Sequence, residues 1–191
     1  MTRLEVLLPA FSLVAIFSAR LLELRTRRNI VAGVITENTT LRLFILTGVI
    51  MLFSTLTELC LLRPRFSWPA FVAGWLLALA SFVVRRRAIA ALGRFWSLHV
   101  EMRENHEFVR SGPFRWLRHP TYFSMLLELL SGPVLAGVRY SLWVIPCLFC
   151  PVLWWRIRLE ERGLIDKFGA AYREYQRTTP ALIPYKWPTR P

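Results

Sequence analysis

Five apolar runs, each roughly 16 to 21 residues long, constrain the fold of this chain more than any other feature of its sequence. At a helical rise of about 1.5 Å per residue, a run of this length crosses most or all of the roughly 30 Å hydrocarbon layer of a bilayer. The hydrophobic content of 54% and the mean hydropathy of +0.39 are too high for an ordinary soluble domain of 191 residues. We therefore predict an all-α, polytopic membrane protein with five transmembrane helices in a single membrane-embedded domain over residues 1–191. The predicted spans are 4–24, 43–62, 66–84, 122–138 and 140–155.

The placement of the positive charges predicts how these helices are oriented. The formal net charge is +13, and arginines crowd the segments that follow the first, third and fifth spans. The other two connections hold only Arg63, Arg65 and Arg139. Under the positive-inside rule, this asymmetry places the amino terminus outside and the carboxyl terminus in the cytoplasm, with cytoplasmic segments at 85–118 and 156–191. Basic loops beside apolar spans account for the charge, so we predict membrane lipid rather than nucleic acid as a partner.

The last two spans are joined by the short connection 137–139, so their helices are predicted to be antiparallel neighbours. This geometry carries the motif Arg118-His119-Pro120-Thr121-Tyr122 to the same side of the membrane as Arg156, Glu160 and Glu161. Charged groups next to a bilayer lose favourable hydration unless they are paired or functional. Their convergence at one end of a helical hairpin therefore predicts a site for a ligand with both a positive and a negative group.

Each of these residues also has a purely structural interpretation. His119 precedes a proline at a helix start, where it either caps the helix or meets a ligand carboxylate. Tyr122 either packs against its neighbours or forms an aromatic wall for a flat or cationic ligand. Arg156 and Glu160 are four residues apart and can form a simple salt bridge. Glu128 lies deeper in the apolar run, where it is paired or protonated, and the sequence indicates no role for it.

Two segments outside the spans carry further structure. Residues 101–118 mix charges with aromatic side chains and are interpreted as an ordered loop that folds over the hairpin, with a solvated linker as the alternative. Residues 156–175 repeat apolar side chains at helical spacing, which predicts an amphipathic helix on the cytoplasmic surface with a break near Gly169. Cys147 and Cys150 have the spacing of a metal-binding pair, but no second pair and no nearby histidine completes a site. They are interpreted as buried helix residues, and no metal is predicted.

A longer set of motifs covers about 80 residues at the carboxyl-terminal end of the chain. It comprises His106-Glu107-Phe108-Val109, Ser111-Gly112-Pro113-Phe114, Arg118-His119-Pro120-Thr121-Tyr122, Glu160-Glu161, Phe168-Gly169, Tyr172, Tyr175 and Leu182-Ile183-Pro184. Together these motifs resemble the isoprenylcysteine carboxyl methyltransferase family. The Arg-His-Pro-x-Tyr motif alone is shared with phospholipid and thiol methyltransferases and with sterol reductases, whereas its combination with the Glu-Glu and Phe-Gly pairs is more specific.

The resemblance implies S-adenosylmethionine as the methyl donor, bound in a cytoplasmic pocket, and a lipophilic acceptor, with the carboxylate of a prenylated cysteine favoured. By position, it gives the catalytic roles to Arg156, near the acceptor, and Glu160, facing the cofactor. The cofactor-binding residues that it implies are His99, His106, Glu107, Phe108, Val109, Phe114, His119, Pro120, Thr121, Tyr122, Glu160 and Glu161.

Departures from the family pattern leave the acceptor open. Ser124 stands where glycine is usual, and Phe114 stands where tyrosine is common. A related methyltransferase that acts on a phospholipid amine or a small thiol would fit the same motifs. Such acceptors must lose a proton and need a base, whereas a carboxylate is already ionised at neutral pH. A sterol reductase is disfavoured by the short chain and the retained Glu-Glu pair, and a non-catalytic membrane scaffold is the fourth possibility.

Overall fold

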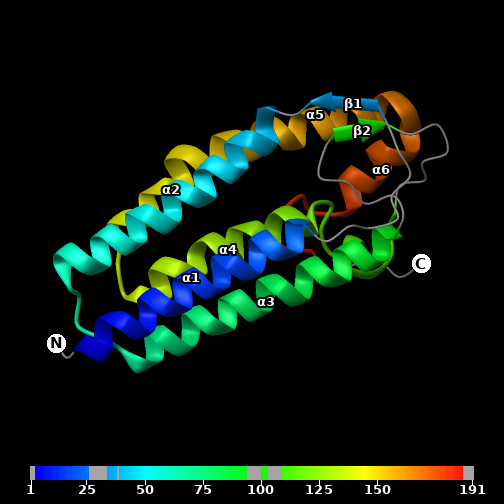
Figure 1. The fold of residues 1–191 in the computed structure, drawn as a ribbon. Helices are drawn as coiled ribbons and strands as arrows, with labels where there is room; N and C mark the ends of the chain where they lie inside the picture. The colour runs from blue at the N-terminus through cyan, green and yellow to red at the C-terminus, as the bar shows by residue number, and fades with distance from the viewer. Residues whose placement is uncertain (1–2, 26–33, 38, 94–99, 103–108, 187–191) are drawn as a thin grey trace.

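The computed structural model describes residues 3–25, 34–37, 39–93, 100–102 and 109–186 (Figure 1). These residues form long helices with short elements between them. The elements are α1 (Arg3–Arg25), β1 (Val34–Glu37), α2 (Thr39–Leu62), α3 (Trp68–Leu92), β2 (Val100–Met102), the 3₁₀ helix η2 (Gly112–Arg115), α4 (Pro120–Ala136), the 3₁₀ helix η3 (Tyr140–Trp143), the π-helix η4 (Ile145–Phe149), α5 (Cys150–Phe168) and α6 (Ala170–Thr178).

The long helices lie side by side in two layers, with α2 and α5 in one and α1, α3 and α4 in the other (Figure 1). Within the second layer, α3 and α4 are in close contact at Gly74, where a Cβ atom would overlap Leu135. Small residues permit such close approach between membrane helices, whose association depends on packing rather than on the hydrophobic effect.

The outer faces of these helices are strongly apolar. Large hydrophobic side chains are exposed along them, including Phe11, Phe53, Leu76 and Trp154, each at least 60% accessible. Such a surface is unsuited to water and suited to lipid. Among the described residues, four helical segments are long and apolar enough to cross a membrane: Leu4–Glu23, Thr39–Leu62, Trp68–Leu92 and Tyr140–Phe168. The chain is therefore a multi-pass membrane protein.

The predicted span 122–138 corresponds to α4, which is 17 residues long and carries Pro133 near its end. It is shorter than the four helical segments that meet the spanning criterion. The all-α prediction also omitted β1 and β2, which pair antiparallel with Val34 opposite Met102. Their few residues lie in the connections, where the sequence has no long alternating pattern that would indicate a sheet.

The described part of the 101–118 segment is an ordered loop rather than a solvated linker. Phe114 and Leu117 are 8% and 5% exposed, respectively. Gly112 adopts a φ of 59° at the start of η2, a conformation that glycine tolerates without strain. The loop leads directly into α4 and so fixes where the Arg118–Tyr122 motif begins.

A sharp connection joins α4 to η3, as the short 137–139 segment predicts. Gly137 ends α4 with a left-handed φ of 67°. Glu58 at the end of α2 accepts hydrogen bonds from the backbone N–H groups of Arg139, Tyr140 and Ser141, at 2.8, 2.9 and 2.8 Å. These bonds satisfy donors that the turn would otherwise leave unpaired.

The last long helix differs from its prediction both where it begins and where it ends. It starts irregularly through η3 and η4, because Pro146 and Pro151 supply no backbone N–H. It then continues as α5 through Arg156 to Phe168, so the predicted amphipathic helix does not begin at Arg156. The break at Gly169, whose φ is 54°, is confirmed, and α6 follows it. Cys147 and Cys150 are exposed on this segment, so their interpretation as buried residues is wrong.

Candidate active site

Tyr122 on α4 and Glu160 on α5 meet at one end of the last hairpin. The Tyr122 hydroxyl donates a hydrogen bond to Oε1 of Glu160. Arg156, one turn before Glu160, donates from Nε to the Tyr122 hydroxyl over 3.0 Å and to Oε1 of Glu160 over 3.1 Å. The convergence that the sequence predicts is therefore present, and the three groups form one hydrogen-bonded unit.

A residue that sequence reasoning missed completes this unit. Thr40 at the start of α2 accepts a hydrogen bond from Nη1 of Arg156 over 2.7 Å. Both residues are buried, with Thr40 0% and Arg156 3% exposed. A threonine at the start of a helix usually suggests a capping residue, so no local signal pointed to a partner 116 positions away.

His119 lies between the two carboxylates of α5. Its Nε2 is 3.0 Å from Oε1 of Glu161, and its Nδ1 is 3.6 Å from Oε2 of Glu160. Its ring also stacks on Tyr122, with 5.5 Å between the ring centroids. His119 occupies the N-cap position of α4 but makes no side-chain capping bond. The structure therefore shows no side-chain cap, and the ring faces two carboxylates of the protein itself.

The acidic surroundings of His119 change its ionisation. Burial lowers the pKa of His119, but hydrogen bonds to Glu160 and Glu161 and the charges of these carboxylates outweigh it. The net result is a pKa raised above the usual value of 6.5. The imidazolium is thus stabilised between the two acidic side chains.

Arg118 ties the start of α4 to the carboxyl-terminal segment. Its Nε bonds Oε1 of Glu161 over 2.8 Å, and its Nη1 donates to the carbonyls of Gln176 and Thr179 over 3.0 and 2.6 Å. The backbone N–H groups of Arg118 and His119 donate to the carbonyls of Pro180 and Ala181 over 2.8 and 3.0 Å. The segment after α6 therefore holds the Arg-His-Pro motif in place.

Two tyrosines of α6 close the same region. The Tyr175 hydroxyl donates to the carbonyl of Phe114 over 2.6 Å. Burial raises the pKa of both the Tyr172 and Tyr175 phenols well above their usual range, so both remain neutral donors at physiological pH. This packing joins α6 to the loop before α4.

The other site residues named from the sequence divide into two groups. Pro120, Thr121 and Val109 lie in the described part of the chain, and Pro120 is fully buried at the first position of α4. His99, His106, Glu107 and Phe108 lie outside the described residues.

Glu128 is paired, which agrees with one of its two interpretations. Arg85 of α3 donates from Nη1 to Oε2 of Glu128 over 2.6 Å and from Nε to Oε2 of Glu23 over 2.8 Å. Arg20 of α1 donates to the same Glu23 oxygen over 3.1 Å and lies 3.7 Å from Glu128. The four charges balance and link α1, α3 and α4, which gives Glu128 a structural role.

The balance of burial in the Tyr122 cluster suits a cationic guest. The side chain of Glu160 keeps 23% of its surface accessible, compared with 4% for Arg156 and 5% for His119. A cationic ligand that reached this cluster would therefore meet the carboxylate of Glu160 before the more deeply buried groups around it.

Comparisons with known proteins point to one family. Residues 74–166 match the isoprenylcysteine carboxyl methyltransferase (ICMT) family. The chain is 32% identical over 127 residues to the uncharacterized protein YpbQ of Bacillus subtilis, covering 63% of this chain and 72% of that protein. It is 32% identical over 120 residues to the protein-S-isoprenylcysteine O-methyltransferase of Saccharomyces cerevisiae, covering 60% of this chain and 48% of that enzyme. It is 28% identical over 117 residues to methanethiol S-methyltransferase 1 of Bradyrhizobium diazoefficiens, covering 60% of this chain and 40% of that enzyme.

The matched region contains the elements that build the site. It includes α4 and the part of α5 that carries Arg156, Glu160 and Glu161. The chain spans less than half the length of the two named enzymes, so they establish descent rather than a shared substrate. The extended similarity to YpbQ and the family match together show that the chain belongs to the isoprenylcysteine carboxyl methyltransferase family.

Proposed function

We propose that the protein transfers a methyl group from S-adenosylmethionine to the carboxylate of a lipophilic acceptor, with prenylated cysteine as the acceptor class. The observation that carries the proposal is the hydrogen-bonded unit of Tyr122, Arg156 and Glu160 at one end of the α4–α5 hairpin. The yeast relative is named for this reaction. The proposed topology has five crossings, including α4, with the amino terminus outside and the site facing the cytoplasm.

The donor side of the site is assigned to Glu160 and the aromatic groups around it. S-adenosylmethionine supplies a methyl group on a positively charged sulfur. The accessible carboxylate of Glu160 would stabilise that charge, and the Tyr122 ring would lie beside it. His119 and Glu161 would complete this wall, because Arg118 and the carboxyl-terminal segment already fix them. Of the remaining cofactor-binding residues, Val109, Phe114, Pro120 and Thr121 lie in the described part, and His99, His106, Glu107 and Phe108 lie outside it.

The acceptor side is assigned to Arg156. A carboxylate acceptor is ionised at neutral pH, with an ordinary pKa of about 3.5, so its methylation needs no general base. Contacts at Nε and Nη1 fix the orientation of the Arg156 guanidinium before any acceptor arrives. A pre-oriented cation would position the attacking oxygen and exclude water, which are the two contributions that this reaction needs.

A thiol acceptor is the second candidate, because the Bradyrhizobium relative is a methanethiol S-methyltransferase. A thiol has an ordinary pKa of about 8.5 and must lose its proton before it attacks. The pair formed by His119 and Glu161, 3.0 Å apart, would have to supply the base. A phospholipid amine would make the same demand. Both acceptors therefore predict a rate that rises with pH, whereas a carboxylate predicts a flat profile above neutrality.

The deciding experiment is a methyl-transfer assay with the purified protein in liposomes. Labelled S-adenosylmethionine would be offered with N-acetyl-S-farnesylcysteine, phosphatidylethanolamine or methanethiol, each over a range of pH. We expect transfer to the farnesylated cysteine at a rate that does not rise above neutral pH. Transfer confined to the thiol or the amine would overturn the carboxylate proposal, and no binding of the methyl donor would overturn the methyltransferase proposal itself.

The role of Arg156 has a matched control two residues along the same helix. Arg158 is exposed, and its guanidinium lies 4.5 Å from the ring of Trp154. We expect Arg156→Ala to lower turnover by more than about tenfold, equivalent to about 1.4 kcal/mol, while Arg158→Ala leaves it near the wild-type level. A smaller effect of Arg156→Ala would show that another group holds the acceptor.

A further inference from the structure

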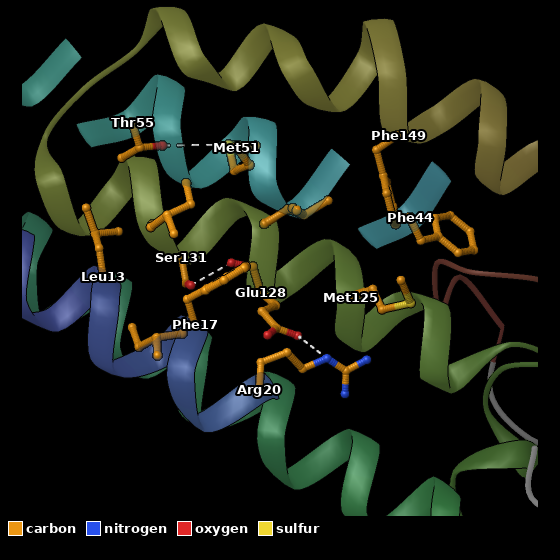
Figure 2. A pocket seen from close by; sticks show the side chains of 15 residues that line it. Leu13, Phe17, Arg20, Phe44, Met51, Thr55, Met125, Glu128, Ser131 and Phe149 are labelled. Atoms are coloured by element: carbon orange, nitrogen blue, oxygen red, sulfur yellow. Dashed lines mark hydrogen bonds and ion pairs between the residues drawn. The ribbon is translucent and has the colours of Figure 1, made fainter. Parts of the chain in front are cut away.

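A cavity of about 120 Å³ lies between the two helix layers, outside the site described above (Figure 2). Its walls come from α1, α2 and α4, and Phe149 of η4 lies at one end. Most of the lining is apolar, with Leu13, Leu52 and Leu129 among the side chains that face it. In a membrane protein, such a space is suited to a hydrocarbon chain rather than to water.

The cavity adjoins the Tyr122 cluster through a pair of aromatic rings. The ring of Phe44, which lines the cavity, is 5.9 Å from the ring of Tyr122 and 5.5 Å from that of Phe149. Tyr122 in turn bonds Glu160 and Arg156. Figure 2 shows Phe44 and Phe149 together at one end of the cavity, with Leu13 and Thr55 toward the other. The packed rings of Tyr122 and Phe44 therefore separate Arg156 from the cavity, and an apolar chain attached to a carboxylate at Arg156 would have to displace the Phe44 ring to enter it.

The cavity is long along the helices. Phe44 and Thr55 both line it from α2, and eleven helical residues correspond to about 16 Å. Gly48 lies between them, and a Cβ atom built there meets nothing within 4 Å. On the facing wall, a Cβ atom at Gly132 would come within 3.1 Å of Leu13. The free space in the cavity is therefore next to Gly48.

One edge of the cavity carries charged side chains that belong to a set whose charges sum to zero. Arg20 and Glu128 line this edge, and their partners Glu23 and Arg85 complete a set of two positive and two negative groups. Each of the four side chains has an ion-pair partner within this set, which joins α1, α3 and α4. They leave the Leu52 and Gly48 side of the cavity as the path for an apolar chain.

We propose that this cavity holds the apolar tail of the methyl acceptor, and that the missing side chain at Gly48 makes room for a long tail. Gly48 is then the residue that determines which tail lengths are accepted. The methylation of such an acceptor rests on the function proposed above, whereas the binding of its tail does not. Because lipid is as apolar as the cavity, selection among tails comes from how well each one packs.

The test enlarges the side chain at Gly48 and measures binding as a function of tail length. N-acetylcysteines carrying geranyl, farnesyl or geranylgeranyl chains would be equilibrated with the purified protein in detergent without methyl donor, and their dissociation constants measured by equilibrium dialysis. The variants are Gly48→Ala and Gly48→Leu, with Leu46→Phe as the control, because Leu46 is 52% exposed on the same helix. Thermal unfolding of each variant would confirm that it is folded.

We expect Gly48→Leu to weaken binding of the farnesyl and geranylgeranyl compounds by about tenfold and to change geranyl binding little, because filling the cavity forces the longer tails to overpack. Gly48→Ala should have a smaller effect of the same kind, and Leu46→Phe none. If Gly48→Leu binds all three compounds as the wild type does, the cavity is not the tail site. Should that variant fail to fold, Leu52→Phe on the same wall answers the question in its place.

The same compounds separate this inference from the proposed function. Methyl transfer to each compound would be measured with the wild type and the Gly48 variants in liposomes. Selective loss of long-tail binding in a protein that never transfers a methyl group would uphold the tail site and reject the methyltransferase proposal. Methyl transfer that does not depend on tail length in either the wild type or Gly48→Leu would uphold the methyltransferase proposal and reject the tail site.

Discussion

Arg156 on α5 donates a hydrogen bond to the Thr40 hydroxyl over 2.7 Å and thereby joins the start of α2 to the centre of the proposed site. Neither residue is exposed by more than 3%. The guanidinium is thus held from two sides, by Thr40 at Nη1 and by Tyr122 and Glu160 at Nε. Its direction is set by packing in the folded protein, before any ligand binds.

Replacing Thr40 with valine should weaken this arrangement without changing the volume of the side chain. Loss of a hydrogen bond to a charged group costs about 1.5–3 kcal/mol. We expect Thr40→Val to raise KM for the acceptor and lower kcat, with little change in donor affinity, while Thr40→Ser restores both parameters. Steady-state kinetics in liposomes and calorimetric donor titration measure these quantities. Equal losses in the valine and serine variants would show that Thr40 contributes packing rather than orientation.

Removing the Tyr122 hydroxyl should uncouple Glu160 from Arg156. Tyr122→Phe keeps the ring that packs on His119 and Phe44 but deletes the group that bonds both charged side chains. We expect methyl transfer to fall by about tenfold to a hundredfold, as for loss of a hydrogen bond to a charged group. Tyr140→Phe is a suitable control, because that tyrosine is 56% exposed near the other end of α4. Unchanged turnover in Tyr122→Phe would contradict the unit as described.

His119 should make the stability of the fold depend on pH. Its pKa in the folded protein is raised by Glu160 and Glu161, so the folded state binds its proton more tightly than the unfolded state. The stabilisation is fully present below the unfolded pKa of about 6.5 and is lost as the pH rises through the higher folded value. His119→Gln removes the titrating group but keeps a hydrogen-bond donor.

Thermal unfolding in detergent from about pH 5.5 to about pH 9 would measure this effect. We expect the wild type to melt a few degrees above His119→Gln at the acidic end, and the gap to narrow as the pH rises. A gap that stays constant across the range would mean that His119 does not titrate in the folded protein. A difference in melting temperature that widens as the pH rises would show that folding lowers the pKa of His119 instead of raising it.

Replacing Arg85 should lower the free energy of unfolding more than replacing any one of its partners. It pairs with Glu23 and Glu128 at once, so Arg85→Met leaves both of these carboxylates to share Arg20. Breaking a buried ion pair in this way costs about 3–5 kcal/mol. We expect unfolding by denaturant to require a clearly lower concentration for Arg85→Met, part of which Glu128→Gln recovers in the double variant. Arg86→Met, at the exposed neighbouring position, should unfold at the same denaturant concentration as the wild type. If Arg85→Met also unfolded at that concentration, the ion-pair network would be ruled out as a source of stability.

Local signals in the sequence were sufficient for the hairpin that builds the site. The apolar runs, the Gly137 turn and the Gly169 break are short-range features, and each determines where a helix ends. Because the turn at Gly137 reverses the chain, Tyr122 and Glu160 both lie away from that turn, on the same side of the bundle. The residues of the charged cluster, apart from Thr40, were therefore predictable from the sequence.

The features that were missed depend on contacts between distant segments. Thr40 finds Arg156 only because α2 packs beside α5, and nothing near Thr40 in the sequence encodes that neighbour. Glu128 finds Arg85 through the close packing of α3 against α4 at Gly74. The continuous course of α5 through its charged turns was also missed, because a change from apolar to amphipathic composition resembles a boundary when only the sequence is read.

Glu58 fixes the position of the turn in the last hairpin. By accepting three consecutive backbone N–H groups, it pins the turn between α4 and η3 to the end of α2. Away from that turn, the hydrogen bonds of Tyr122 with Glu160 and Arg156 join α4 to α5 a second time. The hairpin is therefore fixed at two places, so a substitution at Glu58 should loosen the turn while the contacts at Tyr122 and Glu160 still hold the two helices.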